Sequence, residues 1–291
     1  MIEFATHDNY SEIIKLWEIC FGDRESYIKN FLDCLLTTEN CLVYKENSAI
    51  CAMLFTLKGD LVAGGSRSSA FYIYAACTKP SYRNRGIMSR LIDYATEYAC
   101  KNGIEFLCLV PANESLFDYY AKLGFQIAFK RKELMINRSV LNLIADKDSE
   151  SHSPDMTEIA DLRDNALSSI DYFSWGADVV AYSIIENREA GGISVFASHN
   201  GSLVGYAIFS ESDDTVNVKE FCTLEGHTGH VMNILLQASN KNLFYFHLPV
   251  DFPFSTDDLS VTNNGMALPL SSKAKQTLER IRNAYIGLTL E

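Results

Sequence analysis

One segment in the first half of the sequence constrains the fold more than any other part. It places an apolar strand, a basic loop, a helix, a second apolar strand and a short helix in that order, which is the pattern of an α/β protein. The predicted elements are a strand at Phe71–Cys77, a loop at Lys79–Gly86, a helix at Ile87–Lys101, a strand at Ile104–Val110 and a helix ending in Tyr120–Phe125.

The basic loop carries Arg83, Arg85 and Gly86 directly before the helix. The first N–H groups of a helix have no partner within the helix, and the helix dipole favours an anion there. Gly86 also allows the backbone to approach a ligand closely. These residues predict a phosphate-binding loop. The alternative, for the loop taken alone, is an ordinary solvated turn.

The spacing Arg83-x-x-Gly86-x-Met88 resembles the Arg/Gln-x-x-Gly-x-Gly/Ala signature of the GCN5-related N-acetyltransferases (GNAT), which bind the pyrophosphate of acetyl-CoA. Met88 departs from the last position of that signature. The later Tyr120-x-x-x-Gly124, followed by a phenylalanine, is similar to the pattern of the family's fourth helix. Both motifs occur in the family's order, so the resemblance implies acetyl-CoA as the acyl donor.

The resemblance also implies a set of site residues. In the family, the strand before the loop offers backbone groups to the pantetheine arm and to the oxyanion, and one such preorganised donor lowers the barrier by about 3 kcal/mol. The N–H groups of the loop grip the pyrophosphate. Asn113 is a predicted helix N-cap, and the resemblance implies that it contacts the pantetheine arm as well. The positions are Ala76, Cys77 and Thr78 in the strand, Arg83, Asn84, Arg85, Gly86, Ile87, Met88 and Ser89 in the loop, and Asn113.

Tyr120 takes the position of the family's general acid. A phenol with a pKa of about 10 can protonate a departing thiolate, because a thiol is itself a weak acid with a pKa of about 8.5. Leu116, Tyr120 and Leu123 lie on one face of the predicted helix, and Tyr119 lies about 100° away. The alternative reading is a core tyrosine without a chemical role.

The general base is left open by the sequence. The C-terminal carboxylate at Glu291, or water relayed to Glu114 or Asp118, would each serve. Cys77 beside the reaction centre suggests an acyl-cysteine route. However, no histidine lies near it in sequence to form a thiolate, and the direct transfer of the family needs none.

No metal site is expected. The close histidine pair His227-x-x-His230 has no cysteine or carboxylate nearby in sequence, so a structural or surface role is favoured. The eight cysteines form no Cys-x-x-Cys pair and stand among apolar neighbours, which is typical of reduced thiols.

The second half of the sequence repeats the element order of residues 41–110. It predicts strands at Val195–Ser198, Leu203–Ser210 and Thr215–Thr223, a loop, a helix at Val231–Ser239 and a strand at Leu243–Leu248. Where the first loop has arginines, the second has Glu225, which would repel a pyrophosphate. The expected fold is therefore α/β, with two tandem GNAT-like domains, each a mixed, mostly antiparallel sheet flanked by helices.

The expected domains are an acetyl-CoA-binding domain at 1–145, a polar linker at 146–155 and a degenerate GNAT-like domain at 156–291. This tandem resembles the enhanced-intracellular-survival-type acetyltransferases. We expect the chain to lack their third, sterol-carrier-like domain, since it ends before that domain would fit.

Charge and hydropathy limit the location and the classes of binding partner that we expect for this protein. The N-terminus is too polar for a secretory signal, and no apolar run reaches ~18 residues, so we expect a cytoplasmic protein without a membrane partner. The net charge is −12; residues 151–291 hold 8 Lys and Arg against 18 Asp and Glu. This acidity argues against nucleic acid as a partner and suits a cationic amine, although it is also explained by solubility alone.

The predicted function is transfer of an acetyl group from acetyl-CoA to a primary amine on a cationic small molecule or peptide, by direct attack in a ternary complex. Two alternatives stay open: a transferase for another acyl-CoA, and a non-catalytic acyl-CoA-binding regulatory protein. A structural interaction module ranks below both. Acceptor identity and oligomeric state are not predicted.

Overall fold

The computed structural model describes residues 1–255 and 259–290. The chain divides into two compact units. The first comprises Met1–Leu61, Arg67–Ile127 and Gly265–Arg280, and the second comprises Val62–Ser66, Ala128–Asn264 and Ile281–Glu291. In the described part of the chain, no helix combines the length and the apolarity needed to cross a membrane.

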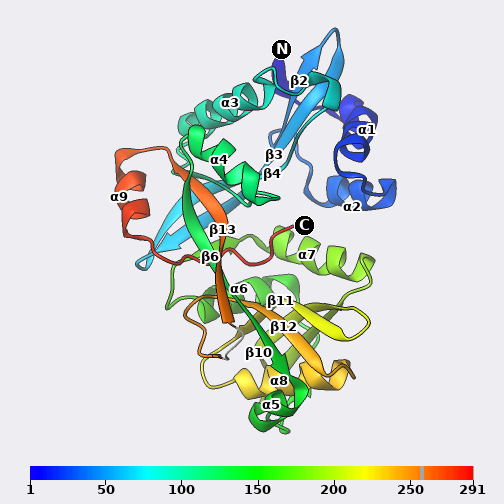
Figure 1. Cartoon of the computed structure of the whole chain (residues 1–291), viewed down its shortest axis with the longest axis vertical. Helices are drawn as coiled ribbons and strands as arrows, with labels where there is room; N and C mark the ends of the chain where they lie inside the picture. Colours follow the sequence, from blue (N-terminus) through cyan, green and yellow to red (C-terminus); the bar gives the residue numbers. More distant parts are fainter. Residues whose placement is uncertain (256–258, 291) are drawn as a thin grey trace. The chain divides into compact units, whose positions relative to one another are not determined.

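The first unit is a mixed sheet with helices on both faces (Figure 1). Its strand order is β1-β2-β3-β4-β5-β13; β4 and β5 are parallel, whereas β2 is antiparallel to β1 and β3, and β13 is antiparallel to β5. The strands are β1 (Ile2–Phe4), β2 (Cys41–Glu46), β3 (Ala49–Ala63), β4 (Ser66–Thr78), β5 (Phe106–Leu109) and β13 (Leu259–Pro269). The helices are α1 (Tyr10–Phe21), α2 (Glu25–Leu35), α3 (Ile87–Lys101), α4 (Glu114–Lys122) and α9 (Ser272–Arg280).

An apolar layer packs against each face of this sheet. On one face an aromatic cluster joins α1 and α2 to the strands: the Phe31 ring centroid lies 5.1 Å from that of Trp17 and 5.0 Å from that of Phe55. On the other face, α3 places Ile87 and Leu91 into a core with residues of the strands. Burial of both layers fixes the ends of the strands and the start of α3.

The second unit repeats this architecture. Its order is β6-β12-β11-β10-β9-β7; β11 and β12 are parallel, and the other described pairs are antiparallel. The strands are β6 (Gln126–Asn137), β7 (Glu150–Ser151), β8 (Tyr172–Trp175), β9 (Ile193–His199), β10 (Ser202–Glu211), β11 (Thr215–Thr223) and β12 (Leu243–Leu248). The helices are α5 (Arg138–Ile144), α6 (Met156–Ala166), α7 (Ala177–Glu189) and α8 (Thr228–Ala238).

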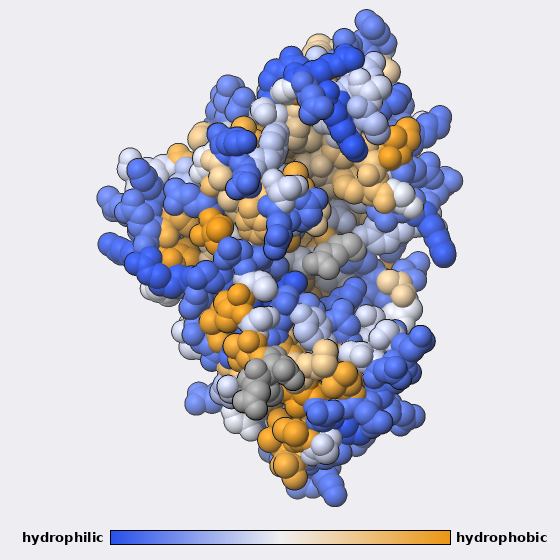
Figure 2. Space-filling model, viewed as in Figure 1, coloured by the Kyte–Doolittle hydropathy of each residue, from blue (hydrophilic) through white to orange (hydrophobic). Residues whose placement is uncertain are grey.

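Helix α8 covers one face of this second sheet, packing Val231 and Leu235 against strand residues such as Val218 and Phe246. Helices α6 and α7 pack against each other, and each of them also contacts β10. Apolar side chains remain exposed on α5, where Leu143 is 84% exposed, and Figure 2 shows apolar residues gathered at that end of the unit.

The last strand of each sheet comes from the other half of the sequence. β6 follows the first half but pairs with β12, with Leu134 opposite Phe246. β13 follows the second half but pairs with β5, with Met266 opposite Leu109. The unit boundaries consequently differ from the expected domains at 1–145 and 156–291. Strand pairing between distant segments leaves no local signal from which such an exchange could be predicted.

Residues 146–155, expected as a linker, lie within the second unit. Glu150 of β7 pairs with Ser198 of β9, and the Asp155 carboxylate accepts a hydrogen bond from the Glu158 N–H as the N-cap of α6. The stretch Leu61–Ser69, which is rich in glycine and serine, is the tip of a long hairpin between β3 and β4. Gly64 and Gly65 make its turn with φ of 54° and 75°, a conformation that suits glycine.

Candidate functional site

The first unit has a gap between its two parallel strands. The described pairs of β4 and β5 run from Ala70 and Phe106 to Tyr72 and Cys108, whereas β4 itself continues to Thr78. Within this stretch Ala75 has a φ of +46°, which is rare for a residue with a Cβ and marks an irregular strand. Past Tyr72, β4 and β5 form no further described pair, so β5 does not bind the backbone groups at the end of β4.

The loop after β4 ends at an uncapped helix. Gly86 is the N-cap of α3 with φ 68° and ψ 16°, and no side chain in the described chain caps this end. Asn84 also has a positive φ, of 62°. The N–H groups at the start of α3, from Ile87 to Ser89, have no partner within the helix, so the loop offers donors and a favourable dipole to an anion.

The two arginines of the loop are held by backbone carbonyls. Arg83 donates from Nε to the Thr78 oxygen at 3.1 Å, and Arg85 donates from Nη2 to the Ser81 oxygen at 3.0 Å. Arg85 also lies over the Tyr82 ring at 4.9 Å. These bonds fix the shape of the loop, and the role of its N–H groups as the principal donors to a pyrophosphate stays a prediction.

Tyr120 on α4 is buried, with 8% of its surface exposed, and packs against the Phe125 ring at 5.6 Å. Burial, followed by the neighbouring Tyr119, raises the pKa of Tyr120 to about 12. Its phenol is therefore protonated at neutral pH, as a general acid must be. The burial fits the core-tyrosine alternative equally well, so the role of Tyr120 stays a prediction.

Asn113 is the N-cap of α4, as predicted, but its side chain does not bond the backbone of the helix. Its Oδ1 accepts a hydrogen bond from the Ser115 hydroxyl at 2.6 Å instead. The side chain is exposed next to α4, and the cofactor contact that the sequence suggested stays a prediction.

The structure distinguishes two thiols near the end of β4. Burial raises the pKa of Cys77 well above its usual value. In contrast, a hydrogen bond with Cys77 and the charge of Arg83 lower the pKa of Cys20 on α1 to about 7, although its partial burial acts in the opposite direction. Of the two thiols, Cys20 is the more exposed and the more readily ionised. Sequence reasoning missed it because 57 positions separate the two residues.

Two of the candidate bases, Glu114 and Asp118, are exposed on α4. The third, Glu291, lies outside the described residues. None of the three is selected by the geometry, and the base stays open.

Backbone that follows α5 lies against the corresponding helix start of the second unit. A Cβ placed on Gly229, in the first turn of α8, would lie 2.7 Å from the Ile144 carbonyl oxygen. The Asp146 N–H donates to the Gly229 oxygen at 2.9 Å. Backbone that follows α5 thus covers this helix start, which supports the prediction that the second unit has lost the phosphate function.

The histidine pair of this second loop has neighbours that the sequence did not reveal. His230 Nε2 lies 2.9 Å from His199 Nδ1 and 3.7 Å from an Asp146 carboxylate oxygen. The His227 ring centroid is 5.0 Å from that of His230. Even so, no three metal-binding side chains among the described residues are arranged to hold an ion.

Comparison with known proteins finds one family model that matches the first part of the sequence. Residues 1–128 match the model of the acetyltransferase (GNAT) domain. No curated protein matches the sequence.

Solved structures share the fold over nearly the whole chain. A GCN5-related N-acetyltransferase from Kribbella flavida has 17% identity and a TM-score of 0.77, covering 94% of this chain and 72% of that one. Eis1 from Mycobacterium abscessus has 12% identity and a TM-score of 0.71, covering 94% and 75%. A tandem GNAT protein of the clavulanic acid biosynthesis pathway has 13% identity and a TM-score of 0.51, covering 93% and 99%. The tandem arrangement is thus found in solved proteins.

Proposed function

We propose that the chain is an acyltransferase that moves an acetyl group from acetyl-CoA to a primary amine, and the match of residues 1–128 to the acetyltransferase (GNAT) domain model supports this proposal. The observation that carries the proposal is the uncapped start of α3 at Gly86, beside the gap between β4 and β5. A pyrophosphate at the helix start would place a pantetheine arm along β4, with its thioester near Ala76 and Cys77.

In the proposed reaction a neutral amine attacks the thioester carbonyl directly. The oxyanion that forms would receive hydrogen bonds from backbone N–H groups at the end of β4, whose positions are fixed before the reaction begins. The carbon–sulfur bond then breaks, and the thiolate takes a proton from Tyr120. The raised pKa of Tyr120 keeps the phenol protonated at neutral pH, so a proton is available when the thiolate leaves.

The amine must lose a proton before or during attack. Glu114, Asp118 and Glu291 are the candidate acceptors of this proton, directly or through water. A cationic acceptor is proposed on the strength of the net charge of −12, which attracts cations to the protein as a whole.

The experiment is a panel of amines with acetyl-CoA, in which release of the CoA thiol is followed. The panel compares polyamine-like, aminoglycoside-like and basic peptide acceptors with neutral and acidic amines of similar size. Turnover with cationic amines supports the proposal. Faster turnover with neutral or acidic amines would remove the acceptor class, and a faster rate with a longer acyl-CoA would change the donor.

One observation favours a second candidate, a non-catalytic acyl-CoA-binding protein. Tyr120 packs in the core of the first unit, where a tyrosine serves stability whether or not it transfers protons. Tight acetyl-CoA binding without turnover of any amine would establish this second function.

A further inference from the structure

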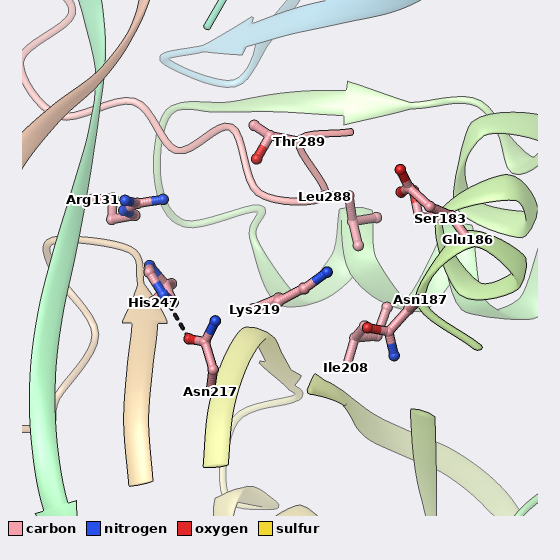
Figure 3. Close-up of a pocket in the computed structure, with 10 residues that line it drawn as sticks. All are labelled: Arg131, Ser183, Glu186, Asn187, Ile208, Asn217, Lys219, His247, Leu288 and Thr289. Carbon is pink, nitrogen blue, oxygen red and sulfur yellow. Dashed lines mark hydrogen bonds between the residues drawn. The ribbon is translucent and has the colours of Figure 1, made fainter. Parts of the chain in front are cut away.

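The second unit contains a small pocket on the sheet face that carries α7 (Figure 3). The space open to the centre of a water molecule in it is ≈ 120 Å³, which is ample for a carboxylate on a short carbon chain. Ten residues line it: Arg131, Ser183, Glu186, Asn187, Ile208, Asn217, Lys219, His247, Leu288 and Thr289.

His247 presents an unused acceptor in this pocket. Its Nε2 lies 2.9 Å from Asn217 Oδ1, an acceptor, so Nε2 carries the proton and Nδ1 keeps its lone pair. Burial, followed by Arg131, lowers the pKa of His247 to about 4, and the ring is neutral at pH 7. The buried Nδ1 has no hydrogen-bond partner among the described residues, and a Glu133 carboxylate oxygen lies 3.8 Å from it. Two acceptors at this separation call for a shared donor, which a ligand can supply.

Two cations stand beside His247. Arg131 binds Glu133 through Nε at 2.7 Å, which leaves its terminal nitrogens for another partner. Lys219 sits where the register of β10 and β11 shifts, since Ile208 pairs with Glu220 and the next residue pairs with Val218. This bulge turns the lysine out of the ladder toward the pocket, and no ion pair of Lys219 occurs in the described chain.

In and beside the pocket, the cations Arg131 and Lys219 are matched in number by two carboxylates, Glu133 and Glu186. Arg131 and Lys219 both disfavour a proton on His247, and Arg131 has a larger effect than Glu133, which favours one. Glu186 on α7 is the acid that lines the pocket, set on the helix wall and not on the sheet that carries the cations (Figure 3). A ligand that satisfies all these groups has an anionic end for the sheet and a hydrogen-bond donor next to it.

We propose that this pocket binds a small carboxylate whose neighbouring carbon bears a hydroxyl or an amine. The carboxylate lies between Lys219 and the free end of Arg131, and the neighbouring group donates to His247 Nδ1. The site belongs to the second unit alone and requires neither acyl-CoA nor Tyr120, so it goes beyond the proposed acyl transfer.

The test is calorimetric titration of the whole protein with three probes at constant ionic strength. Sodium lactate has both features, sodium propionate lacks the hydroxyl, and 1,2-propanediol lacks the carboxylate. We expect lactate to bind best, propionate several-fold more weakly, and the diol not at all. Equal heats from all three, no lactate binding, or equally good binding of inorganic phosphate would each overturn the proposal.

Two substitutions assign the contacts. Lys219→Met should weaken lactate binding at least tenfold, because it removes a charged partner. Lys147→Met, an exposed lysine of the same unit outside the pocket, should change nothing. His247→Phe should abolish the preference for lactate over propionate. An unchanged preference in that variant, or unchanged lactate affinity in Lys219→Met, would contradict the assignment.

Titration of each variant with acetyl-CoA separates this proposal from the acyltransferase proposal. Retained acetyl-CoA binding shows that the protein is folded. Absence of lactate binding in such a protein overturns the pocket and leaves the acyl-transfer site standing.

Discussion

The Ser89 hydroxyl lies 3.2 Å from the Tyr119 hydroxyl, so the first turn of α3 is joined to α4 by a hydrogen bond. Tyr120, the next residue on α4, turns into the core of the first unit. The two adjacent tyrosines thus have different surroundings: Tyr119 reaches the phosphate loop, and Tyr120 lies behind it among apolar side chains. This difference allows their roles to be separated by matched substitutions.

Tyr120→Phe should lower kcat by about 10²-fold or more, because general acid catalysis is typically worth 10²–10⁴-fold. Acetyl-CoA affinity should hardly change. Tyr119→Phe is the matched control, which removes one hydroxyl bound to Ser89 and should affect affinity more than kcat. Steady-state kinetics give kcat for both variants, and calorimetry gives their affinity for acetyl-CoA. An unchanged kcat in Tyr120→Phe would remove Tyr120 as the acid.

Cys20 should be the first thiol to react with iodoacetamide at pH 7. Its pKa is lowered to about 7 by Cys77 and Arg83, whereas burial and Asp33 raise the pKa of the exposed Cys34. Peptide mass spectrometry after brief alkylation gives the order of labelling. Arg83→Ala should slow labelling of Cys20 and leave Cys34 as it was. Faster labelling of Cys34 in the unmodified protein would contradict this environment for Cys20.

The stability of the protein should rise between pH 4 and pH 6.5 in a manner that depends on His247. The folded-state pKa is lowered to about 4, whereas the unfolded histidine titrates near 6.5. Between these values the unfolded state binds the additional proton, so stability is complete above pH 6.5 and is lost as the pH falls through this window. The loss is about 3 kcal/mol. Urea unfolding at several pH values should show it, and His247→Gln should flatten the profile across that window.

The buried ion pair of Arg163 and Glu220 should be sensitive to loss of one partner. The two side chains meet at 2.8 Å, and each is 1% exposed. Glu220→Gln leaves the guanidinium without its counter-ion, and we expect a loss of roughly 3–5 kcal/mol in the free energy of unfolding. Glu25→Gln breaks the exposed pair with Lys29 and is the control, for which little change is expected. Equal losses in the two variants would argue against a buried, dry pair.

Local patterns predicted several elements of both units with the correct bounds. The helix at Ile87–Lys101 and the strands at Thr215–Thr223 and Leu243–Leu248 have the expected bounds. Each lies between strong signals, such as Gly86 before α3, and each buries a regular apolar face. The positive φ at Gly86 likewise follows from its place in the loop.

The features that the sequence did not predict depend on contacts between distant segments of the chain. The exchange of β6 and β13 between the sheets, and the meeting of Cys20 with Cys77, join residues that no local period connects. The pocket at His247 could not be predicted for the same reason. The sequence around Lys219 has the pattern of a regular strand, and only the pairing of β10 with β11 reveals the bulge there.

The central claim is that acyl-CoA binds at the loop before α3, and one titration tests it most directly. Acetyl-CoA is titrated by calorimetry into the unmodified protein, Gly86→Glu and Gly103→Glu. The two glycines have φ of 68° and 70° and open space around them, so both substitutions bring the same backbone strain and the same charge. We predict binding to the unmodified protein and to Gly103→Glu, and none to Gly86→Glu. Equal affinity in the two variants, or no binding to the unmodified protein, would contradict the site.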